Sequence, residues 1–124
     1  MAVEFDFAKL RTALEESNAR SLLELYADNA TMKVVDRNRP PSSPMILDGK
    51  RKIEEFWGDV CSREMTHKVT QEVLGPDRLS FIEECLYPDG CRVLSAMTLN
   101  VRGGRIVEHV TVQAWDEISC APSK

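Results

Sequence analysis

The sequence has 124 residues, 43% of them hydrophobic and 29% charged, and its net charge is −4. This length suits one small domain that folds without a metal or disulfide. The acidic balance argues against nonspecific binding to nucleic acid or anionic membranes, which depends on clustered Lys and Arg. No apolar run approaches the roughly 18 residues of a membrane span and no signal-peptide pattern opens the sequence, so we expect a cytoplasmic protein.

Four cysteines are present, without a CxxC pair and with only two histidines to join them. This pattern does not predict a structural zinc site, and we expect no metal. The expected state in a cytoplasm is the reduced thiol. Cys85 and Cys91 flank a predicted turn at 87–90, and whether these two can pair stays open. The four positions are Cys61, Cys85, Cys91 and Cys120.

The first part of the chain has the apolar spacing of helices. Phe7, Leu10 and Leu14 predict one amphipathic helix, and a second, capped by Ser17 or Asn18, is expected to run through Tyr26. Residues 31–35 are β-prone and predict a short strand, after which 38–47 is expected to be an irregular loop. A third helix is predicted from residue 49 to residue 60, with Asp48 as its cap.

From residue 66 to residue 116 the pattern changes to apolar or alternating runs separated by short turn signals. The turns lie at 75–77, 88–90 and 103–104, and each is short enough for a hairpin. An antiparallel meander is therefore predicted, with strands at 66–74, 78–87, 91–101 and 105–116. We expect a single domain over 1–117 and a flexible tail over 118–124.

Several segments resemble the nuclear transport factor 2-like superfamily, and most closely its bacterial SnoaL-like branch of polyketide cyclases and ketosteroid isomerases. They are residues 25–31 (LYADNAT), Asp48-Gly49, Phe56-Trp57, 104–106 (GRI) and Trp115-Asp116. The resemblance implies an α+β, cystatin-like cone in which three N-terminal helices pack in the concavity of a curved, mainly antiparallel sheet. It supports the fold more strongly than a reaction.

The positions that carry the isomerase chemistry in that family are apolar here. The family's base falls at Val34, its tyrosine near Leu10, and its donor aspartate at Leu94 or Ala96. An aliphatic side chain cannot move a proton. The chain is therefore not expected to be a standard ketosteroid isomerase.

Candidate catalytic groups remain at Asp36, His67, Glu83 and His109. Asp36 shares a strand face with Val34 if that strand continues, although its neighbours favour a solvated loop. The two histidines suit proton transfer near neutral pH, but solitary histidines on sheets are more often structural. A metal held by Asp36 and both histidines lacks any supporting spacing. Glu83, if buried, needs a partner such as His109 or Gln113; otherwise it is exposed.

The alternation of residues in the last predicted strand gives it one polar face, which includes an aromatic residue, and one aliphatic face. The resemblance turns the polar face toward a cavity, whereas alternation alone would leave it in solvent. Trp57 fits either the core or the pocket wall. The candidate ligand-binding residues are Val34, Trp57, Tyr87, Leu94, Thr111, Gln113 and Trp115.

Two functional hypotheses follow. In the first, the protein binds a small, partly apolar molecule in a conical pocket, with or without cofactor-independent acid–base isomerase, cyclase or hydrolase activity. In the second, it is a noncatalytic ligand-binding or dimerisation module. A homodimer is expected through the outer sheet face, with Val110 and Val112 joined by Met97 and Leu99.

Overall fold

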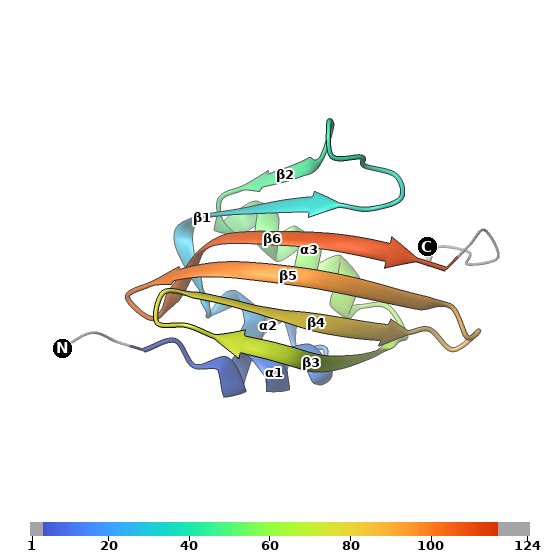
Figure 1. Ribbon diagram of the computed structural model, residues 1–124, viewed down its shortest axis with the longest axis horizontal. Coiled ribbons are helices and arrows are strands. Elements are labelled where there is room, and N and C mark those ends of the chain that lie inside the picture. The colour runs from blue at the N-terminus through green and yellow to red at the C-terminus, as the bar shows by residue number, and fades with distance from the viewer. Residues whose placement is uncertain (1–3, 117–124) are drawn as a thin grey trace.

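The computed structural model describes residues 4–116, which form three helices and one curved, six-stranded sheet (Figure 1). This confirms the expected α+β class. The predicted tail over 118–124 lies outside the described residues. The elements are α1 (Phe7–Glu15), α2 (Ala19–Leu23), β1 (Tyr26–Val35), β2 (Met45–Asp48), α3 (Lys50–Cys61), β3 (Thr66–Leu74), β4 (Arg78–Leu86), β5 (Arg92–Arg102) and β6 (Arg105–Trp115).

The first two helices begin at side-chain caps. Asp6 accepts a hydrogen bond from the Lys9 amide at 3.0 Å, and Asn18 accepts one from the Ser21 amide at 3.1 Å. The second helix is shorter than predicted, because Tyr26 is already the first residue of β1. The Leu25 carbonyl accepts from the Ile106 amide at 2.8 Å, so pairing with β6 overrides the local helical spacing.

The segment expected to be a loop before the third helix contains a strand. β2 pairs antiparallel with residues 31–34 of β1, and Asp48 is its last residue rather than a helix cap. The residue that precedes α3 is Gly49, which has a φ of 101° and makes no side-chain capping bond. A conformation of this kind is essentially restricted to glycine.

The sheet has the order β2-β1-β6-β5-β4-β3. The last four strands form the predicted antiparallel meander, with turns at the three expected places. β1 and β6 are the exception, because they pair in parallel and bring the first and last strands together.

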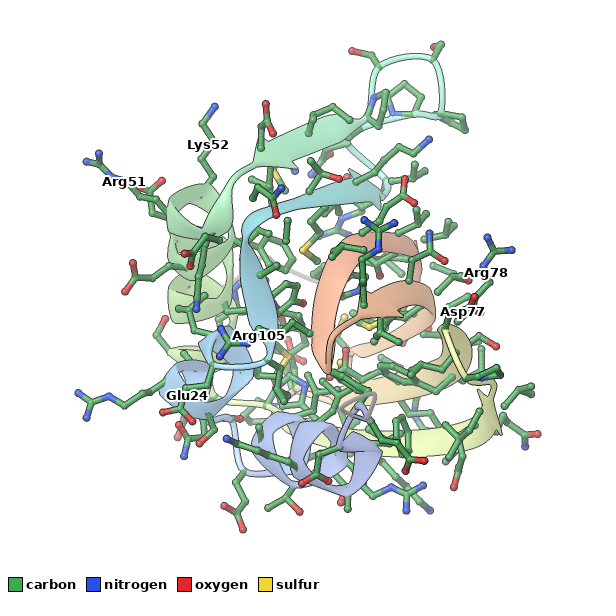
Figure 2. All side chains as sticks on the ribbon, turned by 90° about the vertical axis from the view of Figure 1, so that its left-hand side faces the viewer. Glu24, Arg51, Lys52, Asp77, Arg78 and Arg105 are labelled. Atoms are coloured by element: carbon green, nitrogen blue, oxygen red, sulfur yellow. The ribbon has the colours of Figure 1, made fainter. Side chains whose placement is uncertain are left out.

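All three helices lie on one side of the sheet in Figure 1. Leu10, Leu14, Ile53 and Trp57 from the helices are buried in one core with apolar residues of the facing strands. Charged side chains point outward, as Figure 2 shows for Arg51 on α3 and, on the opposite side, Arg78. Among the described residues, no helix has the length and hydropathy needed to cross a bilayer.

The inward and outward faces of β5 are the reverse of those expected, since Leu94 was expected to face the pocket and Met97 and Leu99 the outer side. Met97 and Leu99 are 3% and 0% exposed, because the register sets them opposite Thr111 and His109 on the inner face. Leu94 is 51% exposed on the outer face, where Ala96 also lies. Met97 and Leu99 therefore belong to the core and not to an outer dimer face.

The cysteines are not all reduced thiols. Cys61 and Cys85 are free, which excludes a bond between Cys85 and Cys91. Cys91 is disulfide-bonded, contrary to expectation. Cys120 lies outside the described residues.

Candidate functional site

Two cavities lie between α3 and the inner face of the sheet. The larger, here called the mouth cavity, has a volume of about 360 Å³ and is bordered by residues 36–39, α3 and the end of β6. The smaller, the inner cavity, has a volume of about 30 Å³ and reaches Glu83 and Cys85 on β4. The two share wall residues, which makes the inner cavity an extension of the mouth. The shared residues are Phe56, Val60, Arg63, Gln113 and Trp115.

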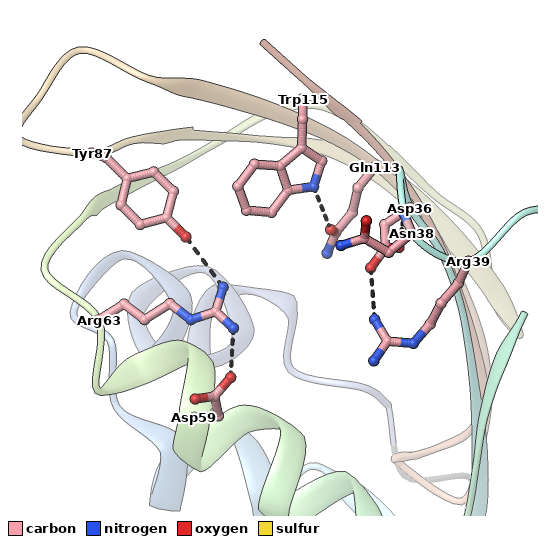
Figure 3. Close-up of polar contacts among 8 residues, drawn as sticks. All are labelled: Asp36, Asn38, Arg39, Asp59, Arg63, Tyr87, Gln113 and Trp115. Atoms are coloured by element: carbon pink, nitrogen blue, oxygen red, sulfur yellow. Dashed lines mark hydrogen bonds and ion pairs between the residues drawn. The ribbon is translucent and has the colours of Figure 1, made fainter. Parts of the chain in front are cut away.

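Polar contacts fix the walls of the two cavities (Figure 3). Arg63, just beyond α3, donates to the Tyr87 hydroxyl at 3.2 Å and forms an ion pair with Asp59. The Trp115 indole N–H donates to the Gln113 amide oxygen at 3.0 Å. Tyr87 and Trp115 are stacked with ring centroids 6.0 Å apart. The result is an aromatic wall beside hydrogen-bonding groups.

Asp36 lines the mouth cavity but not the inner cavity. β1 ends at Val35, and the Asp36 carboxylate accepts from the Asn38 amide at 2.9 Å and pairs with Arg39 at 3.2 Å. These are the contacts of a turn, as the loop interpretation predicted. Asp36 does not join His67 and His109 in a common set of possible metal ligands within the described residues.

The inner cavity ends at a buried cluster of His67, Glu83 and Cys85. Nδ1 of His67 lies 2.8 Å from the Glu83 carboxylate and 3.4 Å from the Cys85 sulfur. All three residues are at least 93% buried, because their exposed fractions are 7%, 3% and 7%. The partner of Glu83 is thus His67, and the expectation of His109 or Gln113 is wrong. Burial, and then the charge of Glu83, raises the pKa of Cys85, so its thiol stays protonated.

Sequence reasoning missed Cys85 as a member of this cluster. The strand register contains the signal, since β3 and β4 pair His67 with Cys85 and Val69 with Glu83. Residues two apart on one strand share a face, so Glu83 and Cys85 both meet His67.

His109 belongs to a second buried network, which contains Tyr26 and Trp57. The Trp57 indole donates to the Tyr26 oxygen at 3.0 Å, and that oxygen lies 2.7 Å from Nδ1 of His109. Burial raises the pKa of Tyr26 and lowers that of His109 to about 3. Both groups are therefore neutral, and His109 is not poised to exchange protons near neutral pH.

The remaining predicted ligand-binding residues occupy different places. Trp57 lines the inner cavity, whereas Val34 and Thr111 are fully buried and line neither cavity. Leu94 lies on the outer face of β5 and lines neither of these two cavities; it borders a separate, open cavity of about 440 Å³ on that outer face.

No protein-family model and no curated protein matches this sequence. Solved structures do match its fold. An NTF2-like protein of unknown function from Mesorhizobium loti aligns with a TM-score of 0.76 and 16% identity over 87% of each chain. A candidate ketosteroid isomerase from Kribbella flavida gives 0.72 and 14%, covering 95% of this chain and 80% of that one. IdmH, a candidate polyketide cyclase from Streptomyces antibioticus, gives 0.65 and 23%, covering 86% and 88%.

These similarities confirm the NTF2-like fold that the sequence motifs indicate. At such identities they concern the arrangement of the backbone, and a reaction has to be argued from the cavities.

Proposed function

We propose that this protein binds a small, partly apolar molecule in the mouth cavity, with one end of the molecule directed into the inner cavity. The observation that carries the proposal is the shared wall of the two cavities, which leads from solvent to a buried carboxylate. Phe56 and Trp115 offer apolar area, and Gln113 offers a hydrogen-bonding amide. A pocket of this composition, which narrows from the mouth cavity of about 360 Å³ to the inner cavity of about 30 Å³, suits a flat ligand with a polar group.

The chemistry that this pocket supports is acid–base catalysis by Glu83. Glu83 is the only carboxylate among the described residues that line the inner cavity. It would take a proton from the bound molecule and return it to a neighbouring atom, as an isomerase or cyclase requires, or take it from water in a hydrolysis. His67 holds the carboxylate in place through the 2.8 Å hydrogen bond. An inner cavity of about 30 Å³ admits only the reacting group.

Mass spectrometry of the molecule released from the purified protein, with tryptophan fluorescence as the binding signal, tests this proposal. Val60→Phe would fill the junction of the two cavities and should abolish binding. Thr98→Val, on the outer face of β5, is the matched control and should bind as the original protein does. Equal binding by Val60→Phe and the original protein would contradict the proposal.

The second candidate is a noncatalytic binding and dimerisation module. It is favoured by the aliphatic side chains at the isomerase positions, since Leu10 and Val34 are 2% and 0% exposed in the core. It is also favoured by apolar side chains on the outer sheet face, where Leu94 and Val112 are 51% and 49% exposed. Glu83→Gln separates the two candidates when it is tested with chelator-treated protein. If the protein is a catalyst, Glu83→Gln abolishes turnover while ligand binding remains. If it is a carrier, neither the original protein nor the variant shows turnover.

A further inference from the structure

The cluster of His67, Glu83 and Cys85 has a geometry that acid–base chemistry does not require. Its three donor atoms lie within 4.8 Å of one another, and each comes from a buried residue. They belong to two paired strands, so the backbone hydrogen bonds of β3 and β4 hold their relative positions. No other group of His, Cys, Asp and Glu in residues 4–116 brings three such atoms together.

The three groups converge on one point instead of forming a relay. In a nucleophilic triad the thiol and the carboxylate bind opposite nitrogens of the imidazole, so that a proton crosses the ring. Here Glu83 and Cys85 both approach Nδ1 of His67, and Nε2 has no hydrogen-bond partner within residues 4–116. The arrangement cannot pass a proton from sulfur through the ring to the carboxylate. It can place three donors around a single atom.

The spacing is close to that of a tetrahedral metal site. Zinc bonds of about 2.0–2.1 Å to nitrogen and about 2.3 Å to sulfur place the two ligands about 3.5 Å apart at a tetrahedral angle. The Nδ1 to Sγ distance is 3.4 Å. The 2.8 Å separation of Nδ1 from the carboxylate is a hydrogen bond, which opens when its proton leaves. A rotation of the Glu83 side chain then suffices to admit the ion.

We propose that His67, Glu83 and Cys85 bind one zinc-class divalent cation, with imidazole, carboxylate and thiolate as its protein ligands. A thiolate and an imidazole favour Zn²⁺ over Mg²⁺ and Ca²⁺, which prefer oxygen ligands. Three protein ligands leave one position open, as in catalytic zinc sites. Glu83 and Cys85 line the inner cavity, so that position faces the cavity and is filled by water or by a donor atom of the bound molecule.

Binding of the cation releases protons and changes no oxidation state. The Cys85 thiol loses its proton to solvent as the sulfur–metal bond forms. The proton that joins Nδ1 of His67 to Glu83 also leaves to solvent, so that the Nδ1 lone pair binds the ion. Nε2 has no hydrogen-bond partner among the described residues, so no second group fixes the ring tautomer, and the neutral, metal-bound ring carries its proton on Nε2. The charges of the thiolate and the carboxylate then balance that of the divalent ion.

This inference stands on three side chains and does not depend on the proposed function. Metal binding is measured without any organic ligand, and ligand binding is measured on chelator-treated protein, so either proposal can fail alone. If both hold, the ion lies at the floor of the pocket. Glu83 would then act as a ligand of the ion, and the bound water would become the proton donor and acceptor.

The test uses tag-free protein stripped of metal with a chelator. Calorimetric titration with Zn²⁺ should show one equivalent bound, and Mg²⁺ should give no heat of binding. Co²⁺ should give the visible bands of a tetrahedral ion and a thiolate charge-transfer band in the near ultraviolet. Cys85→Ser and Glu83→Gln should each weaken Zn²⁺ binding by more than about tenfold. Cys61→Ser, which removes a free thiol outside the cluster, should leave Zn²⁺ binding unchanged.

Two results would overturn the inference. The first is the absence of stoichiometric Zn²⁺ binding by the stripped, folded protein. The second is a cobalt charge-transfer band that persists in Cys85→Ser or disappears in Cys61→Ser, because the ion would then lie elsewhere. Circular dichroism before the metal is added checks that each variant is folded. If Cys85→Ser does not fold, the cobalt spectra of the original protein and of Cys61→Ser still decide the question.

Discussion

The Tyr26 hydroxyl donates its only proton to Nδ1 of His109, over 2.7 Å. The Trp57 indole can only donate, and it does so to the same oxygen at 3.0 Å, so among the described residues His109 is the one acceptor left for the hydroxyl proton. Nδ1 of His109 is therefore the acceptor, and the proton of the neutral ring is on Nε2. One tyrosine oxygen thus satisfies two buried groups from two other elements.

Tyr26→Phe should destabilise the protein by about 2–4 kcal/mol, since it leaves both the indole N–H and Nδ1 buried without partners. Urea unfolding gives this value. Tyr87→Phe is the matched control: it removes one hydrogen bond to Arg63, whose side chain is 25% exposed, and should cost about 1 kcal/mol or less. Equal losses for the two variants would contradict the assigned network.

The free energy of unfolding should decrease as the pH falls below the ordinary histidine pKa. Burial lowers the pKa of His109 from 6.5 to about 3 in the folded protein. Between these values the unfolded chain binds a proton that the folded chain does not. His109 therefore contributes fully to stability above about pH 6.5 and loses about 1.4 kcal/mol per pH unit below it.

Urea unfolding at a series of pH values measures this slope, and His109→Gln should flatten it. NMR provides an independent check, because the His109 ring signals should not move between about pH 8 and pH 4.5. A midpoint near the ordinary value would contradict the buried, neutral state.

Gly49→Ala should destabilise the protein by about 1–3 kcal/mol because of the φ of 101° at this position. A Cβ there would meet no other atom within 4 Å, so the cost is one of backbone conformation. Gly58→Ala is the matched control inside α3, where a Cβ also meets nothing. It should stabilise by about 0.5–1 kcal/mol through helix propensity. Thermal unfolding of both variants measures the two opposite shifts.

Val112→Glu should convert a dimer into a monomer if the outer sheet face is the interface. Val112 is 49% exposed there, and a symmetric dimer would bury two unpaired carboxylates. Ala8→Glu adds the same charge to an exposed position of α1 and should remain dimeric. Sedimentation at micromolar concentration distinguishes these outcomes. A monomeric original protein would end the dimer proposal.

Much of the fold was predictable because long periodic segments leave a clear pattern. α1, α3 and the four meander strands each contain enough alternation or helical spacing to identify them. β2 has four residues, too few for a periodic signal, and it is held by its pairing with β1. The start of β1 at Tyr26 depends on β6, which is distant in the sequence.

The faces of β5 were mispredicted because of one bulge. The hairpin pairs Arg102 with Arg105, and that register, if continued, would set Met97 opposite Val110. The register shifts between Asn100 and Val101, leaving Val107 as the extra residue on β6. Met97 consequently lies opposite Thr111. A shift of one residue exchanges the two faces of a strand, and it cannot be read from alternation on either strand alone.

The buried cluster was only partly predictable for a similar reason. His67 and Glu83 were recognised as candidates, but their pairing depends on the register of β3 with β4. The neutral state of His109 depends on its burial, and its hydrogen-bond partner is Tyr26, which the helical spacing assigns to the second helix.

The parallel pairing of β1 with β6 also determines when the domain can close during synthesis. Residues 26–35 leave the ribosome well before residues 105–115 have been synthesised. β1 therefore cannot pair with β6 until β6 has also emerged. Gln113 and Trp115, which complete the walls of both cavities, arrive with that same strand. Such long-range closure slows folding. A nascent chain stalled before residue 105 should remain sensitive to protease and become resistant once the last strand has emerged.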